Sequence, residues 1–191
     1  MTEPRPDPTA GETPSASVAP PSRKPRAAGE ALSPARQLAN YLTGLRAIVT
    51  EATDSRRIWV RQIGILIQDV RNRPVAMVKP QADQIGTEQL AAFQEIRDKL
   101  EKLKPPPNCE DCQSLFNIWL DKHVAVCRVL IEFGISGDLN KLKAVQGLMS
   151  EGRADLERFQ VEYVRLVTAL RQRVDASRKK RAAKWPFNKA L

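Results

Sequence analysis

The strongest fold signal in this chain is residues 33–73, SPARQLANYLTGLRAIVTEATDSRRIWVRQIGILIQDVRNR. Ser33 and Pro34 are typical of a helix start, because that end favours a side-chain oxygen at the N-cap and proline at the first helical position. Apolar side chains then recur in alternating steps of four and three residues, at Leu38, Leu42, Leu45, Val49, Ala52, Trp59, Ile63, Leu66 and Val70. This is the spacing of a coiled-coil heptad seam, so the segment predicts a helix over about 34–73.

One polar residue, Arg56, occupies a position of this seam. We interpret it as a residue that sets the helix register or pairs with an acid, because polar residues at seam positions commonly do so. Pro74 follows the seam and is expected to end the helix.

Three further helices are expected, over about 88–104, 109–133 and 138–181. Thr87 is placed at the start of the first of them, after a connection over 74–86 that contains Pro80 and Gly86. Three prolines at 105–107 then break the chain, and Asn108 is expected to cap the next helix. Residues 134–137, GISG, predict a tight turn before an N-cap at Asp138.

These helices predict an all-α fold, an antiparallel bundle of three to four long helices with coiled-coil-like seams over residues 33–175. Aromatic residues make up only 5% of the chain and glycines number nine, which argues against an all-β sandwich. Two layouts fit the pattern. In one, the middle of three rods is broken at the prolines; in the other, four helices pack together and the first and last project beyond the others.

The two ends of the chain differ from its middle in composition. Residues 1–32 are rich in proline and poor in large apolar side chains, so they predict a disordered arm that serves as a spacer, a partner-binding segment or a solvated tail. The net charge of +9 is concentrated at the other end, where residues 171–191 hold eight basic side chains and one acidic one. The body is therefore nearly neutral, and residues 176–191 form a basic tail.

The basic tail is the main candidate binding site. Its cations precede a Trp-Pro-Phe sequence, and the candidate residues are Arg178, Lys179, Lys180, Arg181, Lys184, Trp185 and Phe187. Such a cluster suits an anionic membrane surface or the phosphates of a nucleic acid. It also suits docking on a protein partner whose pockets take the two aromatic rings, and a frayed helix end is the remaining interpretation.

All three cysteines and the only histidine fall in one short segment, as Cys109, Cys112, His123 and Cys127. Taken alone, the spacing C-x2-C-x10-H-x3-C resembles a zinc clip with three cysteines and one histidine. On one continuous helix, however, Cys112 and His123 would be separated by about 16 Å of rise, too far for a single ion.

A zinc site therefore requires either a helix that starts near Ile118 or an antiparallel pairing of this segment with its copy in a second chain. Otherwise the four residues are ordinary core side chains, since free cysteine is among the most buried residue types. A redox role is a third alternative, which Glu110 and Asp111 beside Cys109 disfavour.

No nucleotide-binding glycine loop and no local catalytic signature is present in the sequence. We therefore expect a non-enzymatic interaction protein, an adaptor, scaffold or assembly factor, that acts on a protein partner or as a homo-oligomer. The alternative is a zinc-stabilised nucleic-acid-binding or regulatory protein. Residues 1–31 lack the apolar core of a secretory signal and the cysteine count is odd, from which we expect a cytoplasmic location without a cofactor other than zinc.

Overall fold

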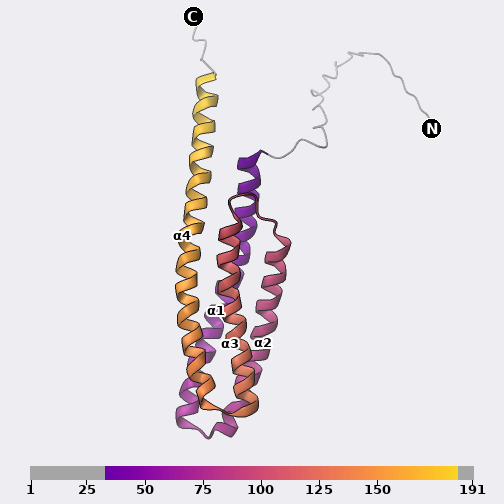
Figure 1. The fold of residues 1–191 in the computed structure, drawn as a ribbon, viewed down its shortest axis with the longest axis vertical. Helices are drawn as coiled ribbons and strands as arrows, with labels where there is room; N and C mark the ends of the chain where they lie inside the picture. The colour runs from indigo at the N-terminus through magenta and orange to yellow at the C-terminus, as the bar shows by residue number, and fades with distance from the viewer. Residues whose placement is uncertain (1–32, 185–191) are drawn as a thin grey trace, which may run out of the picture. The chain divides into compact units, whose positions relative to one another are not determined.

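The computed structural model describes residues 33–184. This range forms four helices (Figure 1), α1 Pro34–Asn72, α2 Val75–Lys102, α3 Glu110–Ser136 and α4 Leu139–Lys184. Within it there is no strand, so the all-α prediction is confirmed. None of these helices has an apolar stretch long enough to cross a membrane. The predicted disordered arm, residues 1–32, and the end of the basic tail, residues 185–191, lie outside the described residues.

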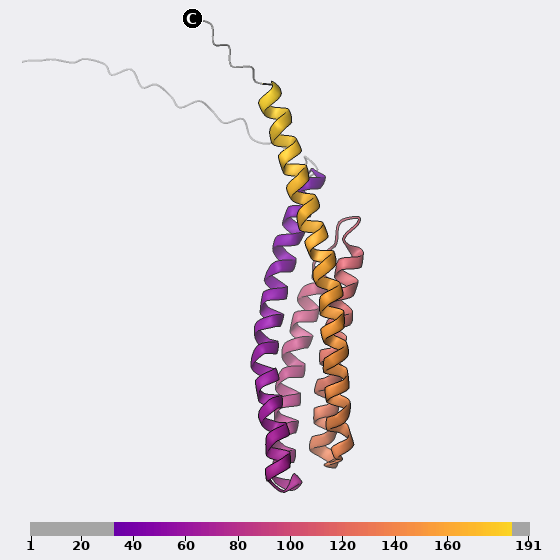
Figure 2. The same ribbon diagram turned by 90° about the vertical axis from the view of Figure 1, so that its left-hand side faces the viewer.

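Consecutive helices run in opposite directions and pack side by side (Figures 1 and 2). The pairs α2–α3 and α3–α4 share the largest contacts, α1 packs on α2, and the contact between α1 and α4 is the smallest. Because α2 and α3 lie against each other along their length, they are two separate helices rather than the halves of one broken rod.

Helix α1 buries most of the apolar positions from which it was predicted, while Val49 and Val70 are partly buried. Leu45, Ala52, Trp59 and Leu66 have no exposed surface, and their steps of seven residues place them on one side of the helix. Ser33 begins the helix with its backbone carbonyl, which accepts the N–H of Arg36 at 2.8 Å, while its side chain makes no capping bond.

Helix α2 begins at Val75, so the predicted connection over 74–86 is wrong. Pro80 lies inside the helix, although it lacks an N–H to donate. The reason is burial: Val78, Ala82 and Ile85 extend the apolar spacing of the second half of α2 and are all core residues. Their removal from water offsets the missing hydrogen bond.

Gly86 marks a close approach of α2 to α3 rather than a helix boundary. A Cβ atom on Gly86 would lie 2.8 Å from the carbonyl oxygen of Cys127. Further along the C-terminal half of α3, a Cβ on Gly134 would lie 2.6 Å from Cβ of Asp83. Two glycines thus allow the two helix backbones to come together, which explains why both are inside helices.

The ends of α3 also differ from the sequence prediction. Its N-cap is Cys109 and not Asn108, whose φ of 73° is left-handed. At the other end the helix continues through Gly134 to Ser136 and stops at Gly137, which has φ 74°. The predicted turn over 134–137 is therefore shorter, and only Gly137 and Asp138 separate the two helices. The predicted cap is confirmed, since the Asp138 carboxylate accepts the N–H of Asn140 at 2.9 Å.

Candidate functional site

His123 lies at the centre of the core, where side chains of α1, α2 and α3 meet. Its ring centroid is 5.5 Å from that of Trp59, 5.2 Å from Phe93 and 4.2 Å from Trp119. Helix α4 closes the remaining side with Gly152, whose Cβ position is 3.4 Å from the His123 ring. Only 4% of His123 is exposed. The histidine is thus a core residue in contact with all four helices.

Both ring nitrogens of His123 have partners. The Arg56 side chain donates an N–H to Nε2 at 3.0 Å, so Nε2 must be the accepting nitrogen. The proton is then on Nδ1, which donates to the Trp119 carbonyl at 2.7 Å. Burial lowers the pKa of His123 to about 4, and the positive charge of Arg56 acts in the same direction. The histidine is therefore neutral at physiological pH.

This contact also gives Arg56 its role. Its partner is a histidine, so the interpretation of Arg56 as the partner of an acid is wrong: within residues 33–184 no carboxylate forms an ion pair with it. Burial lowers the pKa of Arg56, with a contribution from Arg153 on α4. The bond joins α1 to α3, two helices that are not neighbours in the bundle.

The three thiols are buried in the same core. Cys112 and Cys127 have no exposed surface, and Cys109 has 1%. Burial raises the pKa of Cys112 and of Cys127 to about 12, and it raises the pKa of Cys109 as well. Protonated thiols are poor nucleophiles, which disfavours the redox interpretation.

The structure does not bring the four predicted zinc ligands together. Helix α3 is continuous from Glu110, so Cys112 and His123 are separated by the full rise of eleven residues, about 16 Å. In the part of the chain that the structure describes, no three Cys, His, Asp or Glu side chains form a group that could hold a metal ion. Zinc binding remains a prediction that requires a second chain.

The basic residues predicted as a binding site lie on the last turns of α4. Every residue from Arg171 to Ala182 is exposed, and this stretch holds six basic side chains and one acidic one. Arg178, Lys179, Lys180 and Arg181 are consecutive, and successive helix residues point about 100° apart. The four cations therefore surround the helix rather than line one face. Lys184 ends α4, while Trp185 and Phe187 lie outside the described residues.

This part of α4, residues 171–184, is named the basic extension below. In both views α4 continues past the ends of the other helices (Figures 1 and 2). Val174 is the only large apolar side chain among its exposed residues 171–182, and it is 37% exposed. The first residues of the basic extension still lie beside α1, since Arg173 lines a cavity together with Pro34 and Leu38.

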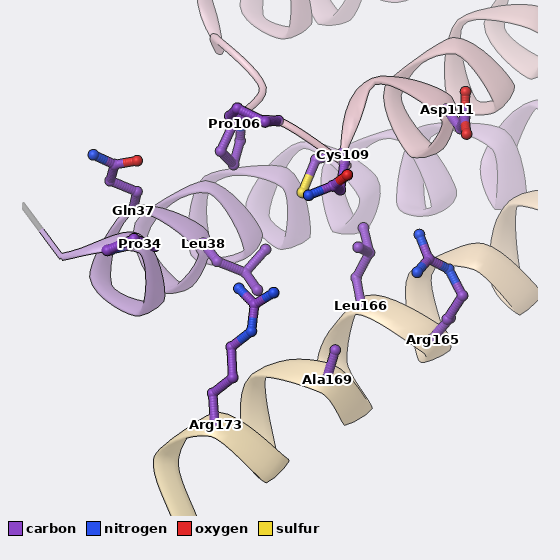
Figure 3. Close-up of a pocket in the computed structure, with 12 residues that line it drawn as sticks. Pro34, Gln37, Leu38, Pro106, Cys109, Asp111, Arg165, Leu166, Ala169 and Arg173 are labelled. Carbon is purple, nitrogen blue, oxygen red and sulfur yellow. The ribbon is translucent and has the colours of Figure 1, made fainter. Parts of the chain in front are cut away.

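A cavity of about 430 Å³ lies where the basic extension leaves the other helices. The start of α1, the proline segment before α3 and the middle of α4 surround it, and Figure 3 shows the side chains that line it. Leu38, Pro106, Leu166 and Ala169 form its apolar surface, and the guanidinium of Arg173 lies beside them. The thiol of Cys109 faces the same space.

No family model matches the chain, and neither a curated protein nor a solved structure matches it. The function must therefore be argued from the residues themselves.

The sequence predicts the cations of the basic extension, but it contains no signal for the cavity and no direct signal for the Arg56–His123 bond. The cavity joins residues near 34, 106 and 169, which come together only after the helices pack. The bond joins residues 67 positions apart. A single hint was present: Arg56 is the one polar residue in an apolar seam, and a buried polar group requires a partner.

Proposed function

We propose that this protein is a non-enzymatic interaction protein that binds an anionic partner through the basic extension. In this proposal the helices form an antiparallel, coiled-coil-like bundle, and the bundle serves as the support for α4. The observation that carries the proposal is that residues 171–182 are all exposed on a helix that continues past its neighbours, with six cations against one carboxylate.

Several features support a contact made by charge. Cations favour the C-terminal end of a helix, but that effect is limited to the last turn and does not require four consecutive ones. Since Arg178 to Arg181 point in all directions, the helix can meet a negative surface from any side. The segment has no apolar face, so it does not resemble an amphipathic helix that inserts into a lipid interface. Phosphates and clustered carboxylates are the groups that it fits.

The test is a charge reversal of the four consecutive cations, Arg178→Glu, Lys179→Glu, Lys180→Glu and Arg181→Glu in one variant. Binding is measured on duplex DNA and on phosphatidylcholine vesicles with and without phosphatidylserine. A basic residue contributes about 1 kcal/mol at an anionic surface, so we expect affinity for the preferred surface to fall at least about a hundredfold. Binding by the unaltered protein should weaken steeply with salt.

A second variant controls for net charge. It carries the same change, Lys or Arg to Glu, at Arg46, Arg61, Arg128 and Lys143, which are exposed on α1, α3 and α4 below the extension. We expect this control to retain most of the binding. Equal loss in both variants would show that total charge, and not the basic extension, determines binding, and no loss in the first variant would exclude the proposal.

A further inference from the structure

The cavity at the base of the basic extension combines an apolar surface with the guanidinium of Arg173, which forms no ion pair within the described residues 33–184. Leu38 and Leu166 are core residues, 5% and 3% exposed, and they form its floor together with Ala169. Arg173 is exposed at its rim. A volume of about 430 Å³ lies within the range of small-molecule sites, about 300–1,000 Å³.

The two arginines of the cavity are not equivalent. Arg165 donates to both carboxylate oxygens of Glu162, and these hydrogen bonds raise its pKa, with a smaller contribution from Asp111. Its charge is thus already compensated. Among the ion pairs of residues 33–184, none includes Arg173. An anion that enters the cavity would therefore meet its uncompensated charge at Arg173.

We propose that this cavity binds a small amphipathic carboxylate, such as a medium-chain fatty acid. The carboxylate lies on the Arg173 guanidinium, which presents two parallel N–H donors to such a group. The apolar chain lies on Leu38, Leu166 and Ala169, where it leaves water. The ligand differs from the anionic partner proposed for the basic extension, because the cavity requires an apolar body as well as a charge. The two proposals share the helix but not the residues tested, since the partner is assigned to Arg178 to Arg181 and the carboxylate to Arg173.

Decanoate is the probe, with decanol and decylamine as neutral and cationic ligands of the same chain length. Titration calorimetry on the full chain should show one saturable site for decanoate. Binding of decanol and decylamine should be at least about tenfold weaker, since a hydrogen bond to a charged group is lost. Hexanoate should also bind at least about tenfold more weakly than decanoate, because four methylene groups fewer leave water.

Two variants locate the site. Arg173→Ala should weaken decanoate binding about tenfold or more, while Arg171→Ala, an exposed arginine outside the cavity, should leave it unchanged. Ala169→Phe should fill the cavity and abolish binding. Thr168→Phe is its matched control, since Thr168 is exposed and does not line the cavity. Circular dichroism checks that each variant keeps its helices.

The four-residue charge reversal of the basic extension should bind decanoate normally, so failure of the interaction proposal leaves this one standing. The proposal is overturned if decanoate shows no saturable site, or if it binds no better than decanol. It is equally overturned if Arg173→Ala and a folded Ala169→Phe variant both bind decanoate as the unaltered protein does. A further outcome would also overturn it: decanoate does not bind, but a peptide with a carboxylate does. The cavity would then be a docking site for a protein.

Discussion

At the scale of single residues, His123 is the buried group that connects the most elements of the core. It contacts aromatic rings from three helices and holds two hydrogen bonds, one to the Trp119 backbone and one to Arg56. A histidine in this position must be neutral, because protonation would place a second positive charge beside Arg56 and leave Nε2 without its role as acceptor. The contact with Arg56 therefore stabilises the folded protein while His123 is neutral and destabilises it once His123 is protonated in acid.

We predict that stability depends on pH through His123. Its pKa is lowered from 6.5 to about 4 in the folded protein, so between these values the unfolded chain binds a proton that the folded chain does not. The contribution is fully present above pH 6.5 and is lost as pH falls toward 4. The loss amounts to about 3 kcal/mol in the free energy of unfolding. Urea denaturation at pH 7 and pH 4.5 captures about 2 kcal/mol of this loss, because pH 4.5 is still above the folded pKa.

The control for this prediction is His123→Gln, which keeps a side-chain oxygen to accept the Arg56 bond but does not titrate in this range. Protonation of other groups also lowers the free energy of unfolding in acid. Glu162 is one of them, because Arg165 lowers its pKa. The difference between the two proteins isolates the histidine. If both lose the same free energy between pH 7 and pH 4.5, His123 does not have the assigned role.

Glycine substitutions test the close approach of α2 and α3. Gly86→Ala should lower the free energy of unfolding by about 1–3 kcal/mol, because the new Cβ would lie 2.8 Å from the Cys127 carbonyl. Gly64→Ala on α1 should raise it by about 0.5–1 kcal/mol, since nothing lies within 4 Å of its Cβ position and alanine favours helix. Denaturant titrations of both variants measure the two changes. Opposite signs support the packing, and stabilisation by Gly86→Ala would contradict it.

At the scale of helices, the accuracy of the sequence prediction varied with the strength of the periodicity. Helix α1 has a long seam with a single polar position, Arg56, and its bounds agree with the prediction within one residue. Helix α2 was predicted too short, because Pro80 and Gly86 are locally unfavourable in a helix. Tertiary packing outweighed both: Val78 and Ile85 are buried, and Gly86 allows two backbones to approach. Such compensation depends on a neighbouring helix and has no local signal.

Pro80 should therefore be a point where α2 can be made more stable. Pro80→Ala restores an N–H within the helix and removes the clash of the proline ring with the preceding turn. Since Pro80 is exposed, no packing is lost. We expect the free energy of unfolding to rise by about 1–3 kcal/mol, measured by chemical denaturation.

The matched change is Pro34→Ala at the first position of α1, where proline is favourable. We expect no gain there, and an equal gain at both positions would contradict the helical placement of Pro80.

At the scale of the whole molecule, the sequence predicts the features that depend on nearby residues and misses those that depend on contacts between helices. The fold class and the position of the cations are properties of local sequence, and they were accessible. The cavity and the contact of Arg56 with His123 depend on how the four helices pack. The separation of Cys112 from His123 is a local property, because it follows from the rise of one continuous helix. A spacing motif such as that of Cys109, Cys112, His123 and Cys127 predicts a shared site only when the chain between its members turns back. Here that chain is one continuous helix.

The most direct test of the proposed function compares the full chain with one that ends at Ala176. This deletion removes Arg178 to Arg181 but none of the buried residues of the core. We predict that binding to the preferred anionic surface, DNA or phosphatidylserine vesicles, falls at least about a hundredfold, while the free energy of unfolding stays within about 0.5 kcal/mol. Equal binding by the two chains would contradict the claim that the protein acts through its basic extension.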